Sequence, residues 1–136
     1  MPPDRLERIN AGNPYAKLIG YQFTRCENGQ CACHVELRGD HHHGGGVVHG
    51  GIAFSLADSA MATGLMSLLD PGQFCATIEL KISYLAPAVR GTLHCESRIV
   101  RRGKNIAFLE ARVFQDETDI ATAQATFAIV TPKPSA

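Results

Sequence analysis

The segment from Val47 to Asp70, VVHGGIAFSLADSAMATGLMSLLD, constrains the fold of this chain more than any other stretch. Between Gly50 and Leu69 it contains a single ionisable residue, Asp58. A helix formed here is apolar on most sides and has to be buried. Because serines and threonines interrupt the segment and a central carboxylate is costly in hydrocarbon, we expect a buried helix of a soluble domain and not a membrane span.

Short runs with strand-like character flank this helix. The turn Asn28-Gly29 between two apolar runs predicts a β-hairpin, and Asp70-Pro71-Gly72 predicts the end of the helix. We expect strands over residues 21–26, 31–38, 76–85, 91–101, 106–115 and 120–130. The order β-β-α-β-β-β-β, with short turns between the last four strands, predicts an α+β domain in which an antiparallel sheet wraps around one long helix.

Length and composition limit the class of protein. We expect residues 1–136 to form one domain, with a lead-in over 1–18 and a frayed tail over 131–136. Lys plus Arg and Asp plus Glu are each 13, and this zero net charge favours neither nucleic acid nor an anionic membrane as partner. The charged N-terminal residues do not resemble a signal peptide. We therefore expect a cytoplasmic protein whose five cysteines are buried, reduced thiols.

The two glycines and the aspartate of the helix allow two interpretations. In the structural one, Gly50 and Gly51 permit close packing on the sheet, and Asp58 lies on a solvated side. In the functional one, the free N–H groups of the helix N-terminus polarise a carbonyl, and glycine lets that oxygen approach. Asp58, among apolar neighbours, is then partly desolvated and a better base. We favour the functional interpretation.

The spacing of these groups predicts a dimer. Gly50 and Asp58 are about 12 Å apart along one helix, at roughly 1.5 Å per residue. A reacting carbonyl needs its donor and its base both at about 3 Å. If they work together, two copies of the chain must combine across a two-fold axis, with Gly50 of one facing Asp58 of the other.

The motif HGG at residues 49–51 followed by LAD at residues 56–58 resembles the signature of hotdog-fold acyl-CoA thioesterases of the phenylacetate-degradation type. The likeness continues through TIELKISYLAPA, which starts at Thr77, and the turn RRGK at residues 101–104. It implies a hotdog fold, a homodimer or a tetramer of two dimers, and hydrolysis of an acyl-CoA thioester without a metal or other cofactor.

The resemblance also assigns roles by position. It implies that Asp58 is the catalytic base or nucleophile, that the Gly50 N–H polarises the thioester carbonyl, and that Thr77 helps to place the water. His49 would order the loop before the helix. The family usually has Asn six residues before the motif histidine, and this chain has His43 there, which could serve as a donor or change the optimum pH. We expect His43 at the inner edge of a loop over the site.

Candidate substrate contacts are less specific. The basic turn residues Arg102, Gly103 and Lys104, with Arg101 beside them, are either solvated turn charges or ligands of the CoA phosphates, and Arg90 is a weaker candidate for that role. The expected walls of the acyl pocket are Gly51, Phe54, Met61, Leu65 and Met66.

Clusters of histidine and cysteine are common metal ligands, but the spacing of these residues here argues against a metal site. No carboxylate or cysteine stands at a convincing spacing from the histidines at 41–43 or from His49. On a strand, Cys31 and Cys33 share one face and His34 takes the other, so the three cannot converge.

Two other functions compete with the thioesterase interpretation. One is a hotdog hydratase or dehydratase, and the other is a non-catalytic hotdog protein that binds acyl-CoA as a sensor or scaffold.

Overall fold

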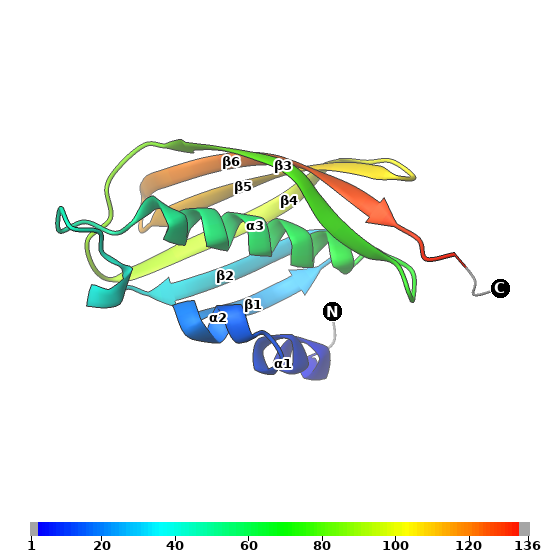
Figure 1. Ribbon diagram of the computed structural model, residues 1–136, viewed down its shortest axis with the longest axis horizontal. Coiled ribbons are helices and arrows are strands. Elements are labelled where there is room, and N and C mark those ends of the chain that lie inside the picture. Colours follow the sequence, from blue (N-terminus) through cyan, green and yellow to red (C-terminus); the bar gives the residue numbers. More distant parts are fainter. Residues whose placement is uncertain (1–2, 134–136) are drawn as a thin grey trace.

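The computed structural model describes residues 3–133, which form one antiparallel sheet wrapped around a central helix (Figure 1). The sheet order is β1-β2-β4-β5-β6-β3. The strands are β1 (Tyr21–Glu27), β2 (Gln30–Glu36), β3 (Phe74–Tyr84), β4 (Thr92–Arg102), β5 (Ile106–Gln115) and β6 (Thr118–Val130), and the central helix is α3 (Gly50–Met66). The predicted element order and the α+β hotdog class are confirmed. Residues 1–2 of the expected lead-in and 134–136 of the expected tail lie outside the described residues.

Helix α3 forms the centre of the core because it is apolar on nearly every side. Leu56, Met61 and Leu65 have no exposed surface. A Cβ on Gly64 would lie only 3.1 Å from the carbonyl oxygen of Gly29, so glycine is what allows the β1–β2 turn to approach the helix. No helix within residues 3–133 is long and apolar enough to cross a membrane.

The helix ends one turn earlier than the proline at position 71 suggested. The Ser67 hydroxyl donates to the Gly64 carbonyl at 2.6 Å and accepts the Gly29 N–H at 2.9 Å. This serine therefore closes the last turn and ties it to the hairpin at the same time. Asn28 and Gly29 both have positive φ, 53° and 79°, as the predicted two-residue turn requires.

Strand β3 lies at one edge of the sheet and, among the residues that the structure describes, pairs only with β6. The strands between the two edges bury alternate residues against α3, whereas most residues of β3 are exposed. Phe74, Ile78 and Tyr84 are its large exposed apolar residues. An edge of this length and character is a surface on which a further strand can pair.

The lead-in consists of two helices, α1 (Pro3–Ala11) and α2 (Pro14–Ile19), and Asn13 is the N-cap of the second. The Asn10 side chain holds β1 by accepting the Phe23 N–H at 2.8 Å and donating to the Phe23 carbonyl at 2.9 Å. The helices thus cover the other edge strand, β1, and leave the β3 edge open (Figure 1).

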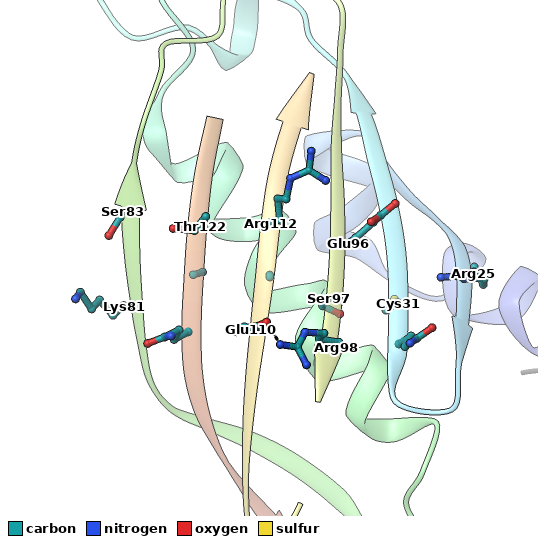
Figure 2. A pocket seen from close by; sticks show the side chains of 14 residues that line it. Arg25, Cys31, Lys81, Ser83, Glu96, Ser97, Arg98, Glu110, Arg112 and Thr122 are labelled. Atoms are coloured by element: carbon teal, nitrogen blue, oxygen red, sulfur yellow. Dashed lines mark ion pairs between the residues drawn. The ribbon is translucent and has the colours of Figure 1, made fainter. Parts of the chain in front are cut away.

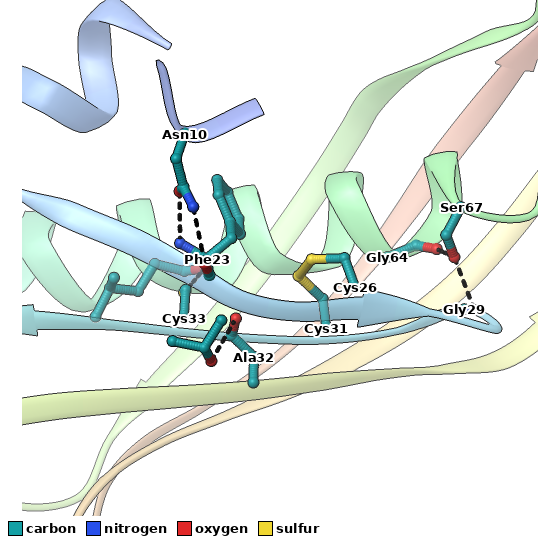
Figure 3. The surroundings of a disulfide bond; sticks show 11 residues. Asn10, Phe23, Cys26, Gly29, Cys31, Ala32, Cys33, Gly64 and Ser67 are labelled. Carbon is teal, nitrogen blue, oxygen red and sulfur yellow. Dashed lines mark hydrogen bonds between the residues drawn. A yellow bond between two sulfur atoms is a disulfide. The ribbon is translucent and has the colours of Figure 1, made fainter. Parts of the chain in front are cut away.

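Two of the five cysteines correct the expectation of reduced thiols. The β1–β2 register places Cys26 opposite Cys31, both on the buried face, and the two form a disulfide (Figure 3). Cys33, Cys75 and Cys95 are free. Strand alternation predicts which residues share a face with Cys31, but the disulfide depends on which residue lies across the hairpin, and that is set by the register.

Candidate active site

The predicted catalytic residues lie in two places, near opposite ends of strand β3. Gly50 contacts Tyr84, the last residue of the strand, whereas Asp58 contacts Thr77 near its beginning. The stretch from Thr77 to Tyr84 spans about 23 Å of extended chain. We call His49, Gly50 and Tyr84 the glycine end, and Asp58 and Thr77 the carboxylate end.

At the glycine end, the first turn of α3 is held from two sides. His49 is the N-cap, and its Nδ1 accepts the Gly51 N–H at 2.8 Å. Tyr84 reaches over from β3, and its hydroxyl donates to the Gly50 carbonyl at 2.7 Å. The Gly50 N–H, the first of the helix, has no acceptor within the helix and points along the positive end of the helix dipole. This end can therefore present a backbone donor to an oxygen.

Both glycines are explained by close packing. A Cβ on Gly50 would lie 2.8 Å from Cζ of Tyr84, and one on Gly51 would lie 2.9 Å from Nδ1 of His49. Real Cβ atoms do not approach other atoms so closely, so larger residues would displace the ring or the cap. Close packing on the sheet thus accounts for Gly50, whereas Gly51 makes room for the His49 cap. Both contacts are compatible with the functional interpretation, since they shape the start of the helix.

A pocket of about 480 Å³ opens at the glycine end. Its walls are largely apolar and come from Val48, Ile120 and the segment that follows Tyr84, and His43 and His49 also line it. The His43 Nδ1 accepts the Gly45 N–H at 2.8 Å, so a neutral His43 carries its proton on Nε2. The pocket thus combines an apolar cavity with imidazole N–H donors.

The histidine-rich loop beside this pocket is anchored at two points. His41 is buried: its Nδ1 accepts the Arg38 N–H at 3.2 Å, and its Nε2 donates to the Ile19 carbonyl at 2.7 Å. The Nε2 of His42 donates to the Val89 carbonyl at 2.7 Å. These contacts use two of the three consecutive histidines to hold the loop and leave His43 to line the pocket.

At the carboxylate end, the Thr77 hydroxyl donates to Oδ1 of Asp58 at 2.7 Å. Asp58 is half-buried. Burial raises the pKa of the neighbouring Cys75 thiol to about 11, and the negative charge of Asp58 contributes to that rise. The predicted partnership of Asp58 with Thr77 is therefore present in the single chain, and the two belong to neighbouring elements of the fold.

The remaining predicted substrate contacts are scattered. Phe54 is exposed on α3, whereas Met61 is fully buried and not open to a ligand in the single chain, and the same holds for Leu65. Strand register places Arg102 in the same cross-strand row as Thr77, three strands away, or about 14 Å. The exposed Arg90 accepts, through its carbonyl, a hydrogen bond from the side chain of Gln115 at the end of β5, two strands from β3.

A second hollow, of about 600 Å³, lies on the outer face of the sheet, away from α3 (Figure 2). Its charged side chains include Arg98 and Glu110, which form an ion pair, and Lys81 on β3. None of the residues that we predicted for the site lines it. This outer groove is therefore separate from the pocket at the glycine end.

Tyr84 is the functional candidate that sequence reasoning missed. Alternation along the strand puts Tyr84 on the same face as Leu80 and Ile82, and in the structure this face is turned toward α3. Its hydroxyl group was the available signal, because a tyrosine at the end of an apolar row usually has a hydrogen-bond partner. That the partner is the first turn of α3 depends on the tertiary structure.

A sheet wrapped around one central helix, with a donor at the helix N-terminus and a carboxylate two turns later, defines a hotdog protein with a candidate hydrolytic site. The Thioesterase superfamily profile matches residues 45–122, which include both ends of the site. The chain therefore belongs to the thioesterase superfamily. The family resemblance noted in the sequence and the expectation of a hydrolase are confirmed at this level.

Individual relatives agree with this assignment. The chain is 29% identical to a candidate esterase of Pseudomonas aeruginosa, PA0474, over 92% of this chain and 95% of that protein. It is 24% identical to a 1,4-dihydroxy-2-naphthoyl-CoA hydrolase of Listeria monocytogenes, over 76% and 83% of the two chains. A candidate thioesterase of Ralstonia eutropha, related to phenylacetic acid degradation, has a similar structure, with a TM-score of 0.81, 27% identity and coverage of 90% and 98%.

Proposed function

We propose that this protein is an acyl-CoA thioesterase whose active site is shared by two copies of the chain. Asp58 of one copy acts on a thioester whose carbonyl is bound by the Gly50 N–H of the other. The observation that supports this most strongly is the placement of the two groups near opposite ends of an edge strand, β3, whose outer side is unpaired within residues 3–133.

Two-fold symmetry brings these ends together. If two β3 strands pair antiparallel about an axis near Lys81, the start of each strand lies beside the end of the other. Thr77 of one copy then faces Tyr84 of the partner subunit. Asp58 is hydrogen-bonded to Thr77, and Gly50 is hydrogen-bonded to Tyr84. The pairing therefore brings the carboxylate end of each chain next to the glycine end of the other.

The exposed apolar surface supports the same pairing. Ile78 and Tyr84 on β3 and Phe54 on α3 are all exposed in the single chain. They belong to the edge strand and the central helix, so a second copy paired along β3 would cover them. Burying each side chain of this size stabilises an interface by roughly 1.5–3 kcal/mol. The same dimers would assemble further into the tetramer that the family resemblance implies.

The proposed reaction needs only groups on the chain and a water molecule. Asp58 takes a proton from water while the water oxygen adds to the thioester carbonyl carbon. The Gly50 N–H of the partner subunit stabilises the negative charge that forms on the carbonyl oxygen. When the carbonyl re-forms, the C–S bond breaks, CoA leaves as the thiolate, and the proton held by Asp58 passes to it. In the variant of this mechanism with Asp58 as nucleophile, an acyl-aspartyl anhydride forms first and water hydrolyses it.

His43 and His49 add polar contacts at the pocket. In each neutral imidazole, Nδ1 accepts a backbone N–H, so Nε2 carries the proton. His43 can thus replace, as a donor, the amide that the family usually has at this position. His49 acts mainly through the backbone, because it caps the turn that contains Gly50.

The pocket and the relatives both support a choice of acyl groups to test. A largely apolar cavity of about 480 Å³ fits an aromatic or medium-length aliphatic acyl group. The named substrate of the Listeria relative makes aromatic acyl-CoA esters the first to test. The turn with Arg102, Gly103 and Lys104, in the same row as Thr77, is the proposed contact for the CoA phosphates. A cytoplasmic location stays a prediction from the N-terminal sequence.

The test is release of free CoA thiol from a panel of aromatic and aliphatic acyl-CoA esters. We expect turnover by the wild type and a loss of about 10²–10⁴-fold in Asp58→Asn, as for removal of a general base. Asp70→Asn, at an exposed aspartate just beyond α3, is the matched control and keeps full activity. Tight binding of acyl-CoA without thiol release would show a non-catalytic binder, and normal turnover in Asp58→Asn would exclude the proposed mechanism.

A further inference from the structure

We propose that Tyr84 is a positioning residue of this reaction, which holds the first turn of α3 so that the Gly50 N–H is aimed at the substrate carbonyl. This inference rests on the proposed function. It is carried by the contact between the Tyr84 hydroxyl and the Gly50 carbonyl, by the packing of the ring on Gly50, and by the place of Tyr84 in the pocket wall.

The position of Tyr84 is itself fixed by the sheet. It is the last residue of β3 and pairs with Ala121 of β6. The next two residues, Leu85 and Ala86, both donate their N–H to the Ile120 carbonyl, at 2.8 and 3.3 Å. The ring therefore projects from a well-anchored strand end, so it can serve as a fixed reference for the start of the helix.

The start of the helix needs such a reference because it contains two consecutive glycines. Glycine has the largest backbone freedom of any residue, and the first turn of a helix lacks half of its hydrogen bonds. The peptide group between Gly50 and Gly51 is held at both ends: its oxygen accepts from Tyr84, and its N–H donates to Nδ1 of His49. On the other side of Gly50, the His49 carbonyl accepts the Ile52 N–H at 3.1 Å.

These contacts hold the peptide groups on both sides of Gly50 and so set the direction of its N–H. Without the Tyr84 hydroxyl, the peptide after Gly50 keeps its hydrogen bond within the helix and its bond to His49, but it loses the contact that ties it to the end of β3. An N–H donor that must reorient when the oxyanion forms stabilises the oxyanion less than a donor that already points at it. The Tyr84 bond also polarises the same peptide group, which strengthens the bond from the Gly51 N–H to His49.

The molecule provides a matched control for the hydroxyl. Tyr21 also reaches α3, and its hydroxyl lies 2.7 Å from Oγ of Ser59, two turns beyond the glycines. Its ring is buried and it does not line the pocket. Tyr21→Phe therefore removes a tyrosine hydroxyl that contacts the same helix, but leaves the contacts of its first turn unchanged.

The kinetic experiment compares Tyr84→Phe with Tyr21→Phe in thiol-release assays. We expect kcat to fall about tenfold in Tyr84→Phe, the value of one well-made hydrogen bond, with KM changed less than about twofold. Tyr21→Phe should keep kcat. A wild-type kcat in Tyr84→Phe, or an equal fall in both variants, would overturn the positioning role, as would a fall confined to KM.

A spectroscopic measurement separates this inference from the proposed function. In ¹⁵N-labelled protein we expect Tyr84→Phe to move the Gly51 amide proton upfield and Tyr21→Phe to leave it in place, while the mass of the assembly stays unchanged. If the wild type releases no thiol, the proposed function fails, and the Gly51 shift still shows whether Tyr84 holds this peptide. If turnover is present but neither Gly51 nor kcat responds, only the inference about Tyr84 fails.

Discussion

The glycine end and the carboxylate end differ in how completely a single chain builds them. At the glycine end, His49 caps the helix, Tyr84 holds the Gly50 carbonyl, and apolar walls already form a pocket. At the carboxylate end, Asp58 is oriented by the Thr77 hydroxyl beside an edge strand that is mostly exposed. The glycine end is thus formed by contacts within one chain, whereas the carboxylate end is more exposed to solvent.

This difference matches what each group has to do. A backbone donor contributes to catalysis only if its direction is set in advance, and that requires packing within the chain. A carboxylate that activates water has to meet both water and a substrate, so it has to remain accessible until the site is assembled. Under the proposed function, the carboxylate end of one chain and the glycine end of its partner together form one active site.

The largest effect is expected from mixing two inactive variants. Asp58→Asn lacks the base, and in Gly50→Val the added side chain collides with the Tyr84 ring, since a Cβ there would lie 2.8 Å from Cζ. When the two chains are co-expressed, mixed dimers contain one intact site, and we expect about a quarter of wild-type activity to return. Thiol release measures this. Activity no greater than that of either variant alone would show that the site is not shared.

A strong effect is also expected at the proposed two-fold axis. Lys81 is exposed on β3, and near the axis its Cα would lie within about 6 Å of its own copy, close enough for a disulfide. Lys81→Cys should therefore form covalent dimers under mild oxidation, as seen on a non-reducing gel. Lys104→Cys, in the exposed β4–β5 turn, is the control. Equal cross-linking of both variants would argue against pairing along β3.

An intermediate effect is expected at Thr77. Thr77→Val keeps the shape of the side chain but removes the donor to Asp58, and we expect kcat to fall about tenfold, whereas Thr77→Ser should keep most activity. Thr126→Val is the matched control, because its hydroxyl also donates to a carboxylate, Glu79, at 2.6 Å on the outer face. Steady-state kinetics distinguish them, and equal losses in the two valine variants would contradict a specific role for Thr77.

The smallest effect is expected at Cys75. Its pKa of about 11 means that the thiol stays neutral in the folded protein between about pH 9 and 11, where an unfolded thiol ionises. Stability should therefore fall as pH rises through that window. Because Asp58 contributes to the rise, Asp58→Asn should lower the Cys75 pKa while burial still keeps it above its ordinary value.

The measurement is the rate of iodoacetamide labelling of Cys75 at pH 9, followed by mass spectrometry. We expect Asp58→Asn to react a few-fold faster than the wild type, because more thiolate is present. Asp70→Asn serves as the control and should react like the wild type. A slower rate in Asp58→Asn would show that the carboxylate does not act on this thiol by its charge.

Much of the fold and part of the site could be predicted from the sequence. The apolar segment with its single carboxylate predicted a central helix, and strand alternation predicted that Cys31 and Cys33 share one face, which is the buried one. The wall residue Met61 was chosen for its apolar character, which does not distinguish a pocket wall from the core, and the structure places it in the core. Tyr84 was missed because alternation along a strand indicates which face a side chain lies on and not which group it contacts.

The sequence by itself determined the elements and their buried faces, because the spacing of apolar residues along a helix or strand is a local property that each segment carries. The tertiary structure alone decided that β3 lies at an edge, that Tyr84 reaches the first turn of α3, and that Cys26 lies opposite Cys31. These depend on strand order and register, which are set when all elements compete to cover the same helix, and no single segment encodes that outcome.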